Sequence, residues 1–146
     1  MKILVDADAC PVKDIIEKVG MQFNLLVVMV IDTSHVLESN YSKVIQVSQG
    51  PDAVDLALIN QAKKGDIVIT GDYGVASLAL GKAAYAMNFN GMYYTLDNID
   101  RLMFERHISK KQRRAKNRHF GHIKKRSKDM DMNFENALIK LCENIL

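Results

Sequence analysis

The chain has 146 residues, of which 48% are apolar and 25% are charged. This composition is typical of one soluble domain and excludes a disordered or fibrous chain. The longest apolar run, residues 25–31, is far too short to cross a bilayer, so we expect no membrane partner. Met1 leads directly into a strand-like segment, and the two cysteines, Cys10 and Cys142, lie at opposite ends of the chain. We therefore expect a reduced, cytoplasmic protein without a secretory signal.

The net charge of +3 is unevenly distributed along the chain. Residues 1–105 hold 8 Lys/Arg against 13 Asp/Glu, residues 106–128 hold 11 against 0, and residues 129–146 hold 1 against 4, giving local charges of −5, +11 and −3. A dense basic segment usually meets phosphates. We expect an α/β domain over 1–105, a nucleic-acid-binding segment over 106–128, and a C-terminal helix within 129–146 that docks on the same domain.

Hydrophobic patterning predicts alternating strands and helices. β-branched runs indicate strands, and apolar positions at helical spacing indicate helices. In chain order, the predicted elements are a strand at 2–5, a helix at 11–23, strands at 25–31 and 43–47, a helix from 52 to about 64, a strand at 66–70, a helix at 75–82, short strands within 85–89 and 92–95, a helix from about 98 to 117, and a helix at 133–145. This alternation favours a three-layer α/β/α fold with a mostly parallel sheet.

Five aspartates follow predicted strands or open predicted helices: Asp6, Asp8, Asp52, Asp55 and Asp72. Ligands of parallel sheets bind at the carboxyl ends of the strands, so we expect these side chains to converge. Clustered carboxylates raise each other's pKa unless a cation or a proton intervenes. Oxygen ligands suit Mg²⁺ or Mn²⁺, and the commonest work of such a site is phosphate chemistry.

Most of these aspartates also have a purely structural explanation. Asp8 is a candidate N-cap of the first helix, Asp52 and Asp55 fit a capping arrangement in a first helical turn, and Asp72 fits a plain turn. Asp6 has the poorest such explanation, because a charge at the end of a buried strand is costly unless it is paired or metal-bound. Asp6 therefore carries most of the prediction of a metal site.

The basic segment carries seven cations between residues 106 and 118, with no acid among them. They would hold a phosphate backbone with a salt-sensitive affinity and little reading of the bases. An alternative is that some of them pair with the acidic body of the fold. The candidate nucleic-acid-binding residues are Arg106, Lys110, Lys111, Arg113, Arg114, Lys116 and Arg118.

For the cysteine near the first helix and for the histidines, we expect no catalytic or metal-binding function. Cys10 stands near the start of the first helix, where a thiolate would be stabilised, but we expect a small buried side chain that fills space near the sheet. The four histidines show no zinc-binding spacing, and we expect solvated side chains.

Four sequence motifs carry a resemblance to a known family. They are VDADACPV at residues 5–12, GPDAVD at 50–55, DIVITGD at 66–72 and the pair Arg113-Arg114. With these motifs the chain resembles, over nearly its full length, the YaiI/YqxD family of uncharacterised bacterial proteins, which is similar to PIN-like nuclease domains. The resemblance implies a PIN-like, Rossmann-like α/β/α fold with acidic residues around one or two Mg²⁺ or Mn²⁺ ions.

The same resemblance assigns roles to the acids. It implies that Asp6 is the metal ligand on the first strand, that Asp55 and Asp72 belong to the same cluster, and that Asp8 and Asp52 flank it. The leading hypothesis is therefore a Mg²⁺- or Mn²⁺-dependent phosphodiesterase acting on RNA or single-stranded nucleic acid, with RNA favoured over DNA. Asp6, Asp8, Asp55 and Asp72 would be its catalytic acids.

Two alternatives stay open. In a haloacid-dehalogenase-like phosphatase, Asp6 and Asp8 would be nucleophile and acid, Thr33 or Ser34 would follow the second strand, and Asp72 would be the late acid; Ala76 stands where a second late acid is expected. The other alternative is a non-catalytic nucleic-acid-binding module on a degenerate nuclease fold, in which the acids merely cap helices.

Overall fold

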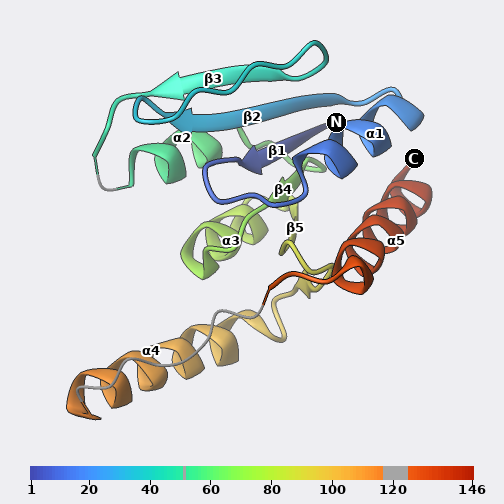
Figure 1. Ribbon diagram of the computed structural model, residues 1–146. Coiled ribbons are helices and arrows are strands. Elements are labelled where there is room, and N and C mark those ends of the chain that lie inside the picture. The colour runs from blue at the N-terminus through green and yellow to red at the C-terminus, as the bar shows by residue number, and fades with distance from the viewer. Residues whose placement is uncertain (51, 117–124) are drawn as a thin grey trace.

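The computed structural model describes residues 1–50, 52–116 and 125–146, with side chains left out at 110 and 112–116 (Figure 1). Strands and helices alternate through most of the chain, as the hydrophobic pattern predicts. The elements are β1 (Lys2–Asp6), α1 (Lys13–Gln22), β2 (Leu26–Asp32), β3 (Lys43–Val47), α2 (Ala53–Gln61), β4 (Ile67–Ile69), α3 (Tyr73–Gly81), β5 (Tyr85–Met87), β6 (Tyr93–Tyr94), α4 (Ile99–Lys116) and α5 (Lys128–Ile145).

The strands form one six-stranded sheet in the order β3-β2-β1-β4-β5-β6. β1 pairs in parallel with both β2 and β4, and β3 and β5 extend the parallel sheet on either side. Only β6 runs antiparallel, as the second strand of a hairpin with β5. The strand order reverses at β1, because the chain moves outward through β2 and β3 and then returns to the other side of β1 with β4.

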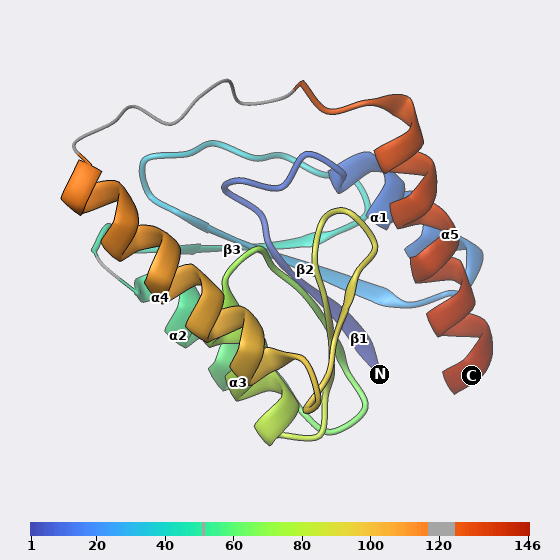
Figure 2. The same cartoon turned by 90° about the horizontal axis from the view of Figure 1, so that it is seen from below.

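Helices cover both faces of the sheet, and the sheet separates two cores (Figure 2). On one face, α1 and α5 pack together, and Ile16, Phe134 and Leu138 lie fully buried against alternate strand residues. On the other face, α2, α3 and the start of α4 bury Leu58 and Ala76 against the opposite sides of the strands. Burial on both faces explains the continuous apolar runs of β1, β2 and β4. The predicted three-layer α/β/α fold is confirmed.

Three helix starts differ from the sequence-based expectation, and one of them is α3, which begins at Tyr73 rather than at Val75. α1 begins at Lys13 rather than at Pro11, because a turn with a bond from Cys10 N to Ala7 O precedes it. α5 begins at Lys128 rather than near Asn133, because the Ser127 side chain accepts a hydrogen bond from Met130 N and caps the helix there. This last helix buries Phe134 and Leu138 in the core that it shares with α1.

The hairpin of β5 and β6 comes very close to α5. At Gly91, where φ is +90°, a Cβ atom would lie 2.8 Å from the backbone oxygen of Asn133, so only glycine fits without movement. None of the helices in the described ranges has the length and apolarity required to cross a membrane.

Candidate metal and nucleic-acid site

The reversal of strand order places Asp6 and Thr70 side by side at the carboxyl edge of the sheet. Asp6 is the last residue of β1, and Thr70 directly follows β4. The fully buried Thr70 hydroxyl donates to Asp6 Oδ2 at 3.1 Å and accepts from Asp72 N at 3.0 Å. In open α/β sheets, ligands bind in the crevice at such a reversal point. Asp6 therefore lies where the topology favours a ligand.

The electrostatic setting of Asp6 disfavours its charge. Burial raises the pKa of Asp6 from 3.8 to about 6; the bond from Thr70 opposes this effect, and the charges of Asp55, Asp8 and Asp72 add to it. Among the described residues, no basic side chain pairs with Asp6. At neutral pH the folded protein therefore holds a carboxylate that lacks a counter-charge.

Asp55 belongs to the same acidic edge, and Asp52 borders it. Asp55 lies half-buried in the first turn of α2, and burial, followed by the charges of Asp72 and Asp52, raises its pKa. Asp52 precedes α2 but does not cap it with its side chain, and its φ of 68° is left-handed. The capping explanation for Asp52 is therefore wrong. Its exposed side chain acts on Asp55 through charge alone.

Asp72 has a structural function that the sequence only partly indicates. It is the N-cap of α3, and its Oδ1 accepts a hydrogen bond of 3.0 Å from Val75 N. The turn expected there is thus the start of a helix. One carboxylate oxygen is occupied by the cap, and the charge of the group still raises the pKa of Asp6 and of Asp55.

Asp8 lies in the loop after β1 and does not cap α1, whose N-cap is Val12. Instead, both Asp8 oxygens accept from Asp32 N at 3.3 Å, and Asp8 Oδ1 lies 3.1 Å from His35 Nδ1. The same His35 nitrogen lies 3.1 Å from Asp32 Oδ1. Asp32 is not among the predicted site residues, and His35 is exposed, as predicted, but also contacts both acids. Asp32 is the last residue of β2 and lies at the same end of the sheet as Asp6. The rule that ligands bind at the carboxyl ends of parallel strands would therefore have predicted Asp32 as well.

The donor chemistry of this edge fits a divalent cation. Its carboxylate oxygens are the ligands that Mg²⁺ and Mn²⁺ prefer. The set whose ligand atoms all lie within 4.8 Å of one another is Asp8, Asp32 and His35, judged over the described residues. Asp6, Asp55 and Asp72 are coupled by charge and are not held as closely. Their repulsion is the kind that a bound cation relieves.

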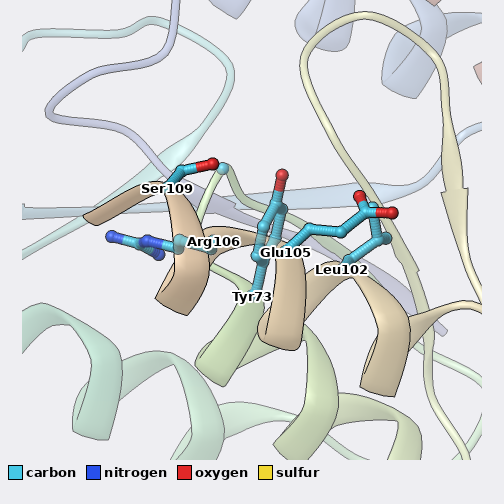
Figure 3. Close-up of a pocket in the computed structure, with 6 residues that line it drawn as sticks. Tyr73, Leu102, Glu105, Arg106 and Ser109 are labelled. Carbon is cyan, nitrogen blue, oxygen red and sulfur yellow. The ribbon is translucent and has the colours of Figure 1, made fainter. Parts of the chain in front are cut away.

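A basic and aromatic groove lies beside the acids. Tyr73 follows Asp72 directly and forms one wall of a cavity of about 360 Å³ between α3 and α4 (Figure 3). The Arg106 guanidinium lies 5.7 Å from the centre of the Tyr73 ring, and Tyr94 meets that ring edge-on at 5.8 Å between centroids. Gly71 and Tyr73 also line a second hollow of about 540 Å³ that reaches Arg126.

The structure describes only part of the predicted nucleic-acid-binding set. Arg106 and Lys111 are exposed on α4. For Lys110, Arg113, Arg114 and Lys116 the structure describes the α4 backbone and not the side chains, and Arg118 lies outside the described residues. Near the end of the basic segment, Arg126 is anchored: it donates to Asn90 Oδ1 at 2.7 Å and bonds to Phe89 O and to Asp131 Oδ1.

Other chemistry-bearing side chains are occupied elsewhere. Cys10 is buried, as expected, and burial raises the pKa of its thiol to about 11. The Ser34 hydroxyl bonds to Asp32, and Asp8 is bound to Asp32 N. The phosphatase alternative needs these two side chains beside Asp6, and their present bonds do not favour that arrangement.

Residues 4–144 match the model of a family described as "Uncharacterized BCR, YaiI/YqxD family". The chain belongs to this family. A UPF0178 protein of Lachnoclostridium phytofermentans is 54% identical over 147 residues, covering 99% of each chain. A UPF0178 protein of Ruminiclostridium cellulolyticum is 56% identical over 139 residues, covering 95% of this chain and 90% of the relative. No solved structure matches the chain.

The resemblance seen in the four motifs is thus confirmed at the level of the YaiI/YqxD family. Family membership is shown over nearly the whole length, including the strand ends that carry Asp6, Asp8 and Asp72. Membership assigns no activity, so the function has to be inferred from the geometry of the site.

Proposed function

We propose that this protein is a Mg²⁺- or Mn²⁺-dependent phosphodiesterase that cleaves RNA or other single-stranded nucleic acid. The observation that carries the proposal is the state of Asp6. It lies at the reversal point of the sheet, its pKa is raised to about 6 by burial and by three neighbouring acids, and no described basic side chain compensates it. An uncompensated acidic group in a crevice is a candidate functional site with a stated physical cause.

In this proposal, Asp6, Asp55 and Asp72 hold the cation, with Asp8 and Asp52 at its margins. A divalent ion bound by carboxylates supplies a water of lowered pKa and neutralises the charge that grows on the phosphate. The chain's own contribution is positional. Thr70 fixes the Asp6 carboxylate, and Val75 N fixes one oxygen of Asp72, so that the acids are oriented before a ligand arrives.

The substrate class follows from charge. Residues 106–128 carry 11 cations and no acid, and Arg106, which opens this segment, stands against Tyr73, next in the chain to Asp72. Cations on this side of the site would hold a phosphate backbone, and their affinity would fall steeply with salt concentration. The acids thus suggest the reaction, and the basic segment suggests a polymeric phosphate rather than a small one.

The test is cleavage of a labelled single-stranded RNA by the purified protein in Mn²⁺. We expect the wild type to cleave and Asp6→Asn to lose at least about 100-fold in rate, as is common when an electrostatic catalytic group is removed. Asp14→Asn, a change at an exposed acid on α1, is the control and keeps the wild-type rate. Equal rates in the wild type and Asp6→Asn would contradict the proposal.

A second candidate, the non-catalytic binding module, is favoured by one observation. Two of the acids have structural functions, because Asp72 caps α3 and Asp8 accepts from Asp32 N. Such a module would have no cation site, so Mn²⁺ would leave its melting temperature unchanged. Binding of Mn²⁺ to the folded protein would instead raise the melting temperature. RNA binding would persist in EDTA, and no cleavage would be seen.

A further inference from the structure

The cavity between α3 and α4 has the size and the chemistry of a nucleobase site. Its volume of about 360 Å³ lies within the range of about 300–1,000 Å³ in which proteins hold small organic groups. Figure 3 shows these lining residues: Leu102, Glu105, Arg106 and Ser109 come from α4 and Tyr73 from α3, and the Arg106 and Glu105 side chains extend to opposite sides of the Tyr73 ring. The wall combines an aromatic ring, a guanidinium, a carboxylate and a hydroxyl.

The Tyr73–Arg106 pair forms the part of the wall that is most informative about the ligand. Unpaired bases stack on aromatic rings and on Arg guanidinium planes, and here the carbon of a guanidinium lies over an aromatic ring, 5.7 Å from its centre. Tyr73 is supported from behind by Tyr94, which is buried and bonds through its hydroxyl to Thr70 O at 3.2 Å. The platform is therefore held by the same Thr70 that fixes Asp6.

Glu105 restricts the kind of group that fits the cavity. Its side chain forms part of the wall, and its carboxylate also accepts a hydrogen bond from Arg101 at 3.1 Å. A phosphate placed in the cavity would meet this negative charge, whereas the N–H groups of a base would find an acceptor. The cavity thus favours a base, and the cations outside it favour the phosphates.

We propose that this cavity binds an unpaired nucleobase of a single-stranded nucleic acid, with the Tyr73–Arg106 pair as its stacking platform. The inference rests on the proposed function in taking a nucleic-acid strand as the ligand of this face. Gly71 and Tyr73 also line the second hollow, which reaches Arg126. The bound nucleic acid would therefore continue past Tyr73 toward the end of the basic segment. Because Tyr73 follows Asp72 directly in the chain, a base stacked on its ring lies next to the turn that carries Asp72.

The experiment compares two fluorescently labelled strands of equal length in EDTA, so that cleavage plays no part. One is an oligouridylate, and the other has the same phosphates but abasic sugars. The wild type is expected to bind the oligouridylate about 5- to 150-fold more tightly, the range expected for one stacked base. Tyr73→Leu should remove this preference and leave the affinity for the abasic strand unchanged. Tyr73→Phe, which keeps the ring, should retain it.

Two further variants distinguish loss of the base site from a folding defect. Ser109→Met fills the cavity from an exposed position of α4 and removes no part of the platform, so it should also abolish the preference. Tyr85→Leu changes a tyrosine that is 41% exposed at the amino end of β5, on the opposite edge of the sheet, and should have no effect. Thermal melting confirms that each variant is folded.

The two proposals fail in different ways. Equal affinity of the wild type for both strands, or an undiminished preference in Ser109→Met, would overturn the base site even if the protein cleaves RNA. A base preference without Mn²⁺-dependent cleavage would support the base site and contradict the phosphodiesterase. Tight binding of duplex RNA with no loss relative to the oligouridylate would also overturn the base site, because paired bases are not free to enter.

Discussion

Asp66 and Asp6 are both aspartates, and they lie at opposite ends of the strands of one sheet. They differ in their partners, because Asp66 has a basic partner and Asp6 has none among the described residues. Asp66 lies before β4, with its side chain 4% exposed, and pairs with Lys2 Nζ at 2.6 Å. It also accepts from Lys2 N at 3.1 Å and from Lys63 N at 2.9 Å. Asp6, at the other edge, has the Thr70 hydroxyl and three neighbouring acids.

The pKa values respond in opposite directions. Burial is the largest influence on both groups and disfavours the charge of each. At Asp66 the bonds from Lys2 and Lys63 outweigh burial, and the pKa is lowered; at Asp6 burial wins, and the pKa rises to about 6. The fold thus pairs one buried acid with a cation and leaves the other without a basic partner among the described residues. This contrast is the main physical reason for placing function at the carboxyl edge.

The largest expected effect comes from removing the charge of Asp66. Asp66→Asn leaves the Lys2 ammonium, which is 18% exposed, without its carboxylate. Breaking a buried pair by changing one partner is strongly destabilising, and with the partial exposure of Lys2 we expect a loss of about 2–4 kcal/mol in the free energy of unfolding. Urea denaturation at neutral pH measures it. A loss below about 0.5 kcal/mol would show that the pair is not structural.

The matching change at Asp6 should have the opposite sign. A rise in pKa from 3.8 to about 6 corresponds to roughly 1–3 kcal/mol of unfavourable charge in the folded state, after allowing for partial exposure. In EDTA at neutral pH, Asp6→Asn should therefore be more stable than the wild type by that amount. A destabilised Asp6→Asn variant would remove the contrast with Asp66.

The pH dependence sharpens this second prediction. Because the folded-state pKa of Asp6 is raised, its contribution to stability is present below pH 3.8 and is lost as the pH rises through about 6. The stability advantage of Asp6→Asn should be absent at low pH, grow across this window and stay constant above it. Urea denaturation in a series of buffers tests the sign. An advantage that does not vary with pH would point to a cause other than charge.

Asp72 provides the smallest and most selective test. Asp72→Ala removes the N-cap of α3 and should cost about 1 kcal/mol in the free energy of unfolding. Asp72→Asn keeps an oxygen that can accept from Val75 N, so its cost should be only a few tenths of a kcal/mol. Denaturation in EDTA measures both. If the two variants lose equal stability, the charge of Asp72 rather than its cap supports α3.

Much of this arrangement could be predicted from the sequence. The β-branched runs of β1, β2 and β4 and the helical spacing between them define a parallel sheet, and parallel sheets bind ligands at the carboxyl ends of their strands. That rule alone placed Asp6 and Asp72. Applied to the end of β2, it would also have placed Asp32.

Other parts depend on contacts that no local pattern encodes. The meeting of Asp8 with Asp32 and His35 depends on how the loops after β1 and β2 fold onto each other. The cavity requires α4 to pack beside α3 and bring Arg106 to Tyr73. Asp8 lies far from Asp32 and His35 in the sequence, and Tyr73 lies far from Arg106. Neither the charge distribution nor the hydrophobic periodicity predicts such long-range contacts.

The most direct measurement of the central claim is calorimetric titration of Mn²⁺ into the wild type, Asp6→Asn and Asp14→Asn at neutral pH. We predict that the wild type and Asp14→Asn bind the ion with equal affinity, because Asp14 is an exposed acid on α1 and is not among the acids whose charges raise the pKa of Asp6. Asp6→Asn should show no binding or a large loss of affinity. Equal Mn²⁺ affinity in all three proteins would contradict the assignment of a cation site to Asp6 and its neighbours.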